Sequence, residues 1–281
     1  MGGFSITFLK MDDELKSYYD APCFSPYYAK GSVSSVTVDT NEDEEELEFD
    51  ETDVEPAPVI RSKEGVLEQL NVEDTRNMLL YVADKIIANK PYLTEVDSAI
   101  GDGDHGIGMA GGMQKAKKKL LKIENERNAY QVFETAGQAM LMSMGGASGV
   151  IFGSLYLAGA KGMEAKDILT AQDIAEMEEK SLIAIQKRGG ARLGDKTMVD
   201  ALSPAVDALK EHAQEGLLEM MKAAEEAARQ GVENTKQYIA KYGRAKSLLE
   251  RAIGYQDAGA TSVYLIFQGM REFIEGSLEN N

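Results

Sequence analysis

Residues 72–89 read VEDTRNMLLYVADKIIAN, and their apolar side chains recur every three or four positions. Leu79, Val82 and Ile86 would share one face of an α-helix, because a helix turns once every ~3.6 residues. Asn71, directly before this stretch, is a residue type that caps helix N-termini. The pattern therefore predicts an amphipathic helix over 72–89, whose apolar face needs other elements to pack against.

Seven further stretches carry the same helical spacing. Thr170 is placed to cap one of them and Gly189 to close it. Pro204 should bend or restart another, because proline lacks the N–H and clashes with the preceding turn. Strand signals are absent from Lys63 onward, and no period of about 30 to 50 residues repeats. The further helices are predicted at 106–122, 129–144, 148–162, 171–187, 197–212, 217–241 and 259–276. Eight helices with short joints predict an all-α fold, a closed antiparallel barrel or bundle over 63–281.

The N-terminal residues differ in composition from this helical part. Residues 39–58 hold 11 Asp or Glu and no Lys or Arg. Dense like charge repels itself and offers little apolar surface to offset chain entropy, so 31–62 is predicted to be a disordered acidic linker. An acidic docking or metal-binding tail is the functional alternative. Phe4–Leu9 alternates like a half-buried strand, and a lone strand needs partners, so 1–30 is interpreted as the end of something larger.

The whole chain is acidic, with 30 Lys or Arg against 47 Asp or Glu in 281 residues and a net charge of −17. Charge of this sign excludes nucleic acid and anionic membranes as partners bound through bulk charge, and it favours a divalent cation. The single cysteine, Cys23, excludes an intramolecular disulfide and a cysteine zinc cluster, which favours a reducing cytoplasm. No apolar run reaches the ~18 residues of a membrane helix, and the first residues lack the order of a signal peptide.

Acidic residues gather in the joint before the second predicted helix. Residues 97–108 read DSAIGDGDHGIG, in which glycines separate Asp97, Asp102 and Asp104. A tight glycine loop can bring three carboxylates to one point, where they repel one another without a cation, since few Lys or Arg lie beside them in sequence. A calcium loop would need a Glu at its twelfth position, so the pattern favours Mg²⁺ shared with substrate phosphates. A solvated acidic turn that caps the next helix is the structural alternative.

Three further joints carry groups that suit a phosphate. The run GGASG at 145–149 precedes an apolar helix, so backbone N–H groups there would face an anion, although glycines at a helix start also serve packing. The joints at 188–200 and 243–262 mix flexible backbone, charges of both signs and hydroxyls. A solvated, salt-bridged loop is the alternative for these two. The residues of these joints add Gly146 and Thr197 as groups that would cradle phosphates.

Four ordered motifs resemble the nucleotide-binding L domain of dihydroxyacetone kinases over about residues 65–280. They are LTEVDSAIGDGDHGIGMAGG, GGASG, GDKTMVDALSPA and GRAKSLLERAIGYQDAGATS. The resemblance implies a barrel of eight antiparallel helices that binds ATP or ADP and two Mg²⁺ ions at one end. By matched position it implies Asp97, Asp102 and Asp104 as the catalytic magnesium ligands. It implies nucleotide contacts for His105, Ala147, Ser148, Gly189, Met198, Arg244, Asp257 and Gly259.

The sequence departs from the family pattern at three positions within these motifs. Gly108, at a nucleotide-binding position, stands where the family usually has Asn, Tyr255 where it has His, and Ala258 where it has Pro. Loss of the Asn amide removes one expected contact to a nucleotide phosphate and leaves the metal site unchanged. Because Gly108 and Ala258 offer the nucleotide fewer contacts than the usual family residues, we expect bound nucleotide to exchange freely and ATP to be the direct phosphoryl donor.

Residues 2–28 are similar to the end of the K domain, which holds dihydroxyacetone and precedes the L domain in the fused kinases. The resemblance implies the C-terminal part of an ATP-dependent dihydroxyacetone (glycerone) kinase, inactive without a K domain or K subunit as its partner. Three alternatives stay open: an L subunit that retains ADP as a phosphate carrier or regulator, a kinase of lipid carboxyl groups, and a phosphatase. The oligomeric state, a homodimer included, is also left open.

Overall fold

The helix expected from 72–89 is α2, Val72–Ala88, in the computed structural model, which describes residues 67–124 and 126–276. Seven more long helices follow at the predicted places. They are α4 His105–Leu120, α5 Ala129–Ser143, α6 Gly146–Ala160, α7 Ala171–Gly189, α8 Val199–His212, α9 Leu217–Thr235 and α10 Ala258–Glu275. The predicted all-α fold built on these eight helices is therefore confirmed.

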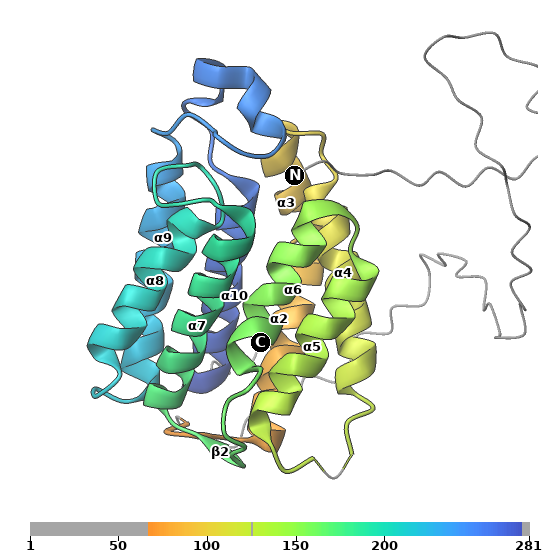
Figure 1. The fold of residues 1–281 in the computed structure, drawn as a ribbon, viewed down its shortest axis with the longest axis vertical. Coiled ribbons are helices and arrows are strands. Elements are labelled where there is room, and N and C mark those ends of the chain that lie inside the picture. The colour runs from red at the N-terminus through yellow and green to blue at the C-terminus, as the bar shows by residue number, and fades with distance from the viewer. Residues whose placement is uncertain (1–66, 125, 277–281) are drawn as a thin grey trace, which may run out of the picture. The chain divides into compact units, whose positions relative to one another are not determined.

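The eight long helices close into a ring (Figure 1). Each packs against the next along the chain, and α10 packs against α2. Because the chain reverses direction from one helix to the next, alternate joints lie at the same end of the ring. The end drawn at the top of Figure 1, called the upper end below, holds the joints 99–104, 144–145, 190–198 and 236–257. All four joints with chemical groups thus meet there.

The apolar stripes form one core inside the ring. On α2, the predicted stripe residues Leu79, Val82 and Ile86 are at most 3% exposed. Met140 and Met220 are also fully buried, as expected of a flexible side chain that fills core gaps. A fully buried apolar side chain contributes about 1.5–3 kcal/mol, so the ring is stabilised mainly from within.

The close contact between α6 and α7 depends on Gly159. A Cβ at this position would collide with the Met177 carbonyl oxygen and the Ser181 hydroxyl. We expect Gly159→Ala to destabilise the fold by about 1–3 kcal/mol, because the backbone of α7 would have to move. Gly111 on α4 is the matched control: a Cβ there meets nothing within 4 Å, so Gly111→Ala should stabilise by about 0.5–1 kcal/mol. Urea unfolding followed by circular dichroism measures both, and equal midpoints would contradict the prediction.

Four short elements were not predicted. They are the helix α3, Lys90–Ser98, the 3₁₀ helix η1, Arg244–Ala252, and the antiparallel strands β1, Leu70–Asn71, and β2, Ile168–Leu169. The prediction that strands are absent is therefore wrong for this pair, because two residues are too few to show alternation.

Two predicted helix features differ in the structure. Helix α8 runs through Pro204, so the proline does not restart it, and burial of Leu202 before it and Leu209 after it holds both halves in one helix. Helix α9 ends at Thr235 and not at 241. Beyond this point the N–H groups bond three residues back, as the Tyr238 N–H does to the Thr235 carbonyl oxygen at 3.2 Å, and the Lys196 ammonium donates to the same oxygen at 2.6 Å.

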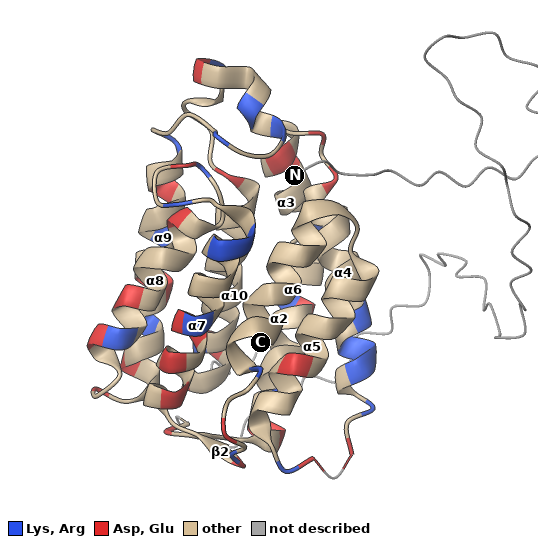
Figure 2. Ribbon diagram, in the orientation of Figure 1, with Lys and Arg blue, Asp and Glu red and all other residues tan. Residues whose placement is uncertain are grey.

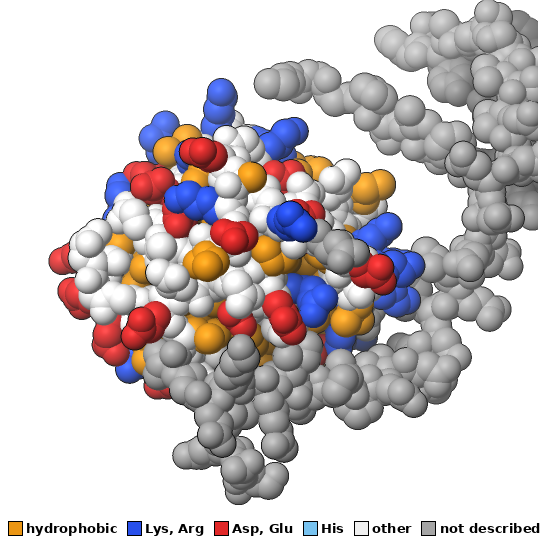
Figure 3. All heavy atoms as spheres, turned by 90° about the horizontal axis from the view of Figure 1, so that it is seen from below, with side chains coloured by type: hydrophobic (Ala, Val, Ile, Leu, Met, Phe, Trp, Pro, Cys, Tyr) orange, Lys and Arg blue, Asp and Glu red, His pale blue; other side chains and the backbone are white. Residues whose placement is uncertain are grey.

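The predicted strand at 4–9, the K-domain-like segment 1–30 and the acidic linker 31–62 lie outside the described residues. Within 67–124 and 126–276, no helix is long and apolar enough to cross a membrane. The ribbon of Figure 2 shows acidic and basic residues along most of the helices and in the loops of the upper end. The opposite end, seen from below in Figure 3, carries both signs of charge interspersed with hydrophobic side chains.

Candidate functional site

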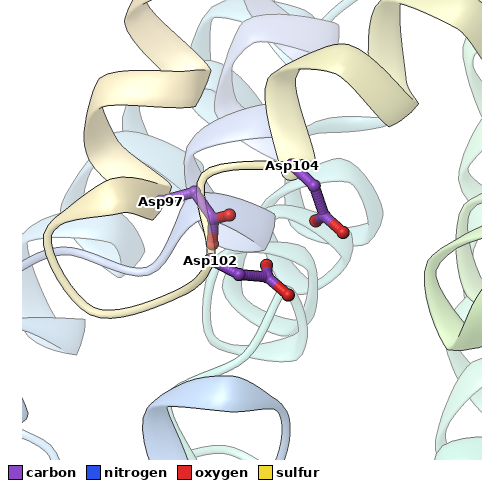
Figure 4. A group of neighbouring side chains, drawn as sticks. All are labelled: Asp97, Asp102 and Asp104. Atoms are coloured by element: carbon purple, nitrogen blue, oxygen red, sulfur yellow. The ribbon is translucent and has the colours of Figure 1, made fainter.

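Asp97, Asp102 and Asp104 come together at the upper end, as their spacing predicts (Figure 4). Asp97 lies in the last turn of α3, Asp102 in the loop that follows, and Asp104 at the N-cap of α4. Each offers a carboxylate oxygen, and these oxygens lie within 4.8 Å of one another. Among the described residues, no other group of three or more His, Cys, Asp or Glu side chains is this close. The three carboxylates are near enough to share one cation.

Glycines allow this loop to turn tightly. The Gly101 N–H donates to the Asp97 carbonyl oxygen at 2.5 Å, and a Cβ on Gly101 would collide with the Asp97 carboxylate. Gly103 has a φ of +77°, a conformation that side chains disfavour. The His105 N–H donates to Asp97 Oδ2 at 3.3 Å and anchors that carboxylate to the start of α4. The glycines at 101 and 103 thus let the carboxylates converge.

One cation from a distant part of the chain faces the three carboxylates. Arg244 Nε, at the start of η1, lies 2.6 Å from Asp102 Oδ2. Partial desolvation would raise the pKa of Asp102, but the Arg244 guanidinium outweighs it and lowers that pKa. The pKa of Asp104 is raised, first by desolvation and then by the Asp102 charge. This ion pair was not predicted, because Arg244 lies far from the three aspartates along the chain. A single guanidinium still leaves the cluster negative, which favours a divalent cation.

Four helix N-termini lie at the same end as the carboxylates. Helices α4, α6, α8 and α10 all begin there, because alternate helices of the ring share one direction. A helix N-terminus carries roughly +0.5 of an elementary charge and unpaired N–H groups. No side chain caps the start of α6 at Gly145, and Gly146, Ala147 and Ser148 are exposed. The first N–H groups of α6 are therefore available to an anion.

His105 forms an uncharged wall of the site. Its Nε2 lies 2.8 Å from the Ser262 hydroxyl, and its ring centre lies 5.7 Å from that of Phe152. Burial lowers the pKa of His105 below its usual range. The imidazole is thus neutral at pH 7 and adds polarity without charge.

Two further aspartates fold the remaining joints. The buried Asp200 accepts N–H donors from Gly194 at 2.5 Å and Thr197 at 2.7 Å, which folds the loop back onto the start of α8. Asp257, the N-cap of α10, accepts from the Ala260 N–H at 2.8 Å, and burial raises the pKa of Asp257 to about 7. These bonds fix the positions of both joints beside the carboxylates.

Most of these groups line one cleft of about 860 Å³, whereas Asp200 lies behind its lining. The cleft holds the three carboxylates and each predicted nucleotide-binding residue except Gly189, which lies at the end of α7 beside Ile151. It therefore brings together Asp97, Asp102, Asp104, His105, Gly108, Gly146, Ala147, Ser148, Thr197, Met198, Arg244, Asp257 and Gly259.

Several other residues that line the cleft were not predicted. The apolar wall of Ile107, Ile151 and Phe152 belongs to helix stripes that in sequence resemble core positions. Lys196 also lines the cleft, and it is 1% exposed. Its only sequence signal was a charge within the run GDKT.

Comparison with known proteins agrees with this geometry. The family model described as the DAK2 domain matches residues 99–272. The ADP-binding subunit DhaL of the PEP-dependent dihydroxyacetone kinase of Escherichia coli K12 is 35% identical over 194 residues, 68% of this chain and 92% of that protein. The L-erythrulose kinase of Pectobacterium atrosepticum is 32% identical over 277 residues, 96% of this chain. This chain spans 45% of that kinase, about half its length.

A solved structure shares the fold. The crystal structure of the dihydroxyacetone kinase of C. freundii in complex with AMP-PNP and Mg²⁺ matches with a TM-score of 0.54 at 23% identity, over 88% of this chain and 38% of that one. The family model covers more than half of the sequence, and the DhaL subunit is matched over most of its length. The chain therefore belongs to the DAK2 domain family.

Proposed function

We propose that this helical domain binds a magnesium nucleotide in the cleft and donates its γ-phosphoryl group to a hydroxyl of a small ketose held by a K domain. One observation carries the proposal: three carboxylates and four helix N-termini face the same cleft. The carboxylates suit a cation and the N-termini suit an anion, and a magnesium nucleotide offers both. Named relatives that are dihydroxyacetone and erythrulose kinases support the same interpretation.

The residues fit Mg²⁺ by their chemistry. Asp97, Asp102 and Asp104 are hard oxygen donors on a glycine loop, and their mutual repulsion is relieved by a bound cation. We infer that they hold the magnesium, with two ions as the family resemblance implies. When bound, Mg²⁺ neutralises the charge that develops on the transferring phosphoryl group.

The other residues of the cleft would hold the nucleotide in place. We infer that the first N–H groups of α6, at Gly146–Ser148, and the Thr197 hydroxyl cradle the phosphates, and Arg244 lines the same cleft from η1. The turn at 257–259 and Met198 close the nucleotide side of the cleft. Such fixed donors act by positioning and by spreading charge, so phosphoryl transfer needs no covalent intermediate on this domain.

The acceptor would come from a second domain or subunit. The alignment with the erythrulose kinase covers 96% of this chain, whereas that with the DhaL subunit covers 68%, so the longer match includes residues outside the helical domain. This supports the interpretation of 1–30 as the end of a K domain and of 31–62 as a linker.

Mixing tests the proposed function directly. The purified chain should show no kinase activity with ATP, Mg²⁺ and dihydroxyacetone or erythrulose when assayed by itself. Addition of a K subunit loaded with the ketose should produce ketose phosphate. Absence of product with every K subunit tried, while the chain hydrolyses ATP, would favour a phosphatase.

The direct phosphoryl donor is proposed to be ATP, and Gly108 offers the test. A Cβ at Gly108 meets nothing within 4 Å, so Gly108→Asn fits and supplies the amide that the family usually has there. We expect ADP release to slow about tenfold, because a hydrogen bond to a charged group is worth about 1.5–3 kcal/mol. Gly108→Ala separates the amide from the added Cβ. Stopped-flow release of a fluorescent ADP analogue measures all three proteins.

The same measurement distinguishes the alternative. Release from the unmodified protein over hours, with recharging only by a phosphohistidine protein, would contradict direct donation by ATP. It would instead favour a carrier that retains ADP, like the ADP-binding subunits to which the chain is similar.

A further inference from the structure

Lys196 combines two costly features. Its side chain is 1% exposed, and its backbone has a φ of +59°, a conformation that non-glycine residues seldom adopt. Burial lowers the pKa of Lys196 below its usual range. A buried ammonium in a strained backbone persists only where the surrounding structure requires it.

The ammonium of Lys196 joins two points that lie far apart along the chain. Its Nζ donates to the Thr235 carbonyl oxygen at 2.6 Å and to the Tyr255 carbonyl oxygen at 2.5 Å. These residues flank the segment 236–254, called the strap below, which contains η1. The Gly254 N–H also donates to the Lys236 carbonyl oxygen at 2.7 Å. Lys196 therefore holds the two ends of the strap close together.

The neighbouring residue fastens the strap a second time. The Asp195 side chain accepts from Lys241 Nζ at 2.6 Å, and its carbonyl oxygen accepts from the Lys241 N–H at 3.1 Å. Between these fastenings the strap has little core of its own, because Ala240 and Ala252 are its only buried residues. Its position is thus set by the loop at 195–196 more than by packing.

The strap carries Arg244, whose guanidinium faces Asp102 across the mouth of the cleft. We propose that Lys196 is a positioning residue: it holds the two ends of the strap, at Thr235 and Tyr255, together and thereby holds Arg244 over the phosphates of a bound nucleotide. The proposal rests on the proposed function, because it takes a nucleotide as the ligand that Arg244 meets. A lysine that only capped α9 would need its contact to the Thr235 carbonyl oxygen alone. The Lys196 ammonium also bonds the Tyr255 carbonyl oxygen, at the other end of the strap.

Trypsin provides the first test, without any ligand. The strap contains Lys241, Arg244, Lys246 and Arg251 as exposed cleavage sites. Lys196→Met keeps the length of the side chain and removes the ammonium, so cleavage within the strap should become about tenfold faster while the melting temperature stays within a few degrees. Lys210→Met is the matched control, since Lys210 pairs with Glu179 on the surface and lies outside the cleft. Unchanged strap cleavage in a folded Lys196→Met protein overturns the proposal.

A double-mutant cycle provides the second test, with Mg-ADP affinity measured by calorimetry. Lys196→Met and Arg244→Ala should each weaken binding about tenfold, and the double variant should bind no more weakly than the weaker single variant, since one residue acts through the other. Additive losses overturn the proposal.

If Lys196→Met does not fold, Lys241→Ala replaces it in the trypsin experiment. The Lys241 side chain is 66% exposed, and loss of its ion pair with Asp195 should accelerate strap cleavage several-fold. Unchanged cleavage there also overturns the proposal. A wild-type chain that binds no Mg-ADP contradicts the proposed function, and the trypsin result still decides the role of Lys196.

Discussion

Asp102→Asn should lower ketose kinase activity, measured with a K subunit, by about 10³-fold, the size typical of removing one group that stabilises developing charge. The amide keeps the shape of the side chain but offers a cation no negative charge. In the unmodified protein, Mg-ADP at a hundredfold excess over Kd should raise the free energy of unfolding by about 2.7 kcal/mol and raise the melting temperature. In Asp102→Asn this rise in melting temperature should disappear. Thermal unfolding with and without Mg-ADP measures it.

Asp207→Asn is the matched control for this experiment. Asp207 is exposed on α8 and does not line the cleft, so the same chemical change there should leave activity and the Mg-ADP effect intact. Retention of both in Asp102→Asn would remove the metal assignment, and loss of both in Asp207→Asn would point to a general charge effect.

Glu178→Gln should abolish a large pH dependence of stability. Glu178 on α7 is 2% exposed, its Oε2 has no hydrogen-bond partner, and burial raises its pKa from 4.5 to about 8. The folded protein therefore keeps a proton that the unfolded chain loses above pH 4.5. The contribution of Glu178 to the free energy of unfolding is fully present below pH 4.5 and is lost as the pH rises to 8. Between pH 5 and pH 8 the free energy of unfolding should therefore fall by about 4 kcal/mol. The amide variant should lack this loss and be the more stable protein at pH 8.

The neighbouring Glu179→Gln is the control. Glu179 pairs with Lys210 at the surface, where side chains are 41% and 48% exposed, so its replacement should leave the pH profile almost unchanged. Urea unfolding at several pH values between 5 and 8 measures all three proteins. Parallel profiles for Glu178→Gln and the unmodified protein would show that Glu178 is charged in the folded state.

The long helices were predicted well because each has a full apolar stripe, as on α2, or a clear cap, as at Thr170, whose side chain accepts from the Asp173 N–H. Helix α3 was missed because only Leu93 and Val96 of that helix are buried, and η1 because only Ala252 is. Short elements held by neighbours carry too little periodicity to be seen in sequence.

The candidate site was predicted as a set of joints, and the up-and-down order of the ring explains why the joints coincide. Its long-range pairs were not predicted. Arg244 reaches Asp102 from η1, and Lys196 reaches Thr235 and Tyr255, through packing that no local pattern encodes. Gly189 was predicted from matched position alone, and it lies outside the cleft lining.

The ends of the helical domain adjoin at the end opposite the cleft, where the Leu67 N–H donates to the Ile274 carbonyl oxygen at 3.1 Å. Any domain joined ahead of Leu67 must deliver its substrate past the full length of α2, whose 17 residues rise about 25 Å. We therefore propose that the segment ahead of Leu67 acts through its length, since it must span this rise before an attached acceptor can reach the donor. Shortening the stretch 31–62 by half should then slow turnover without altering nucleotide binding.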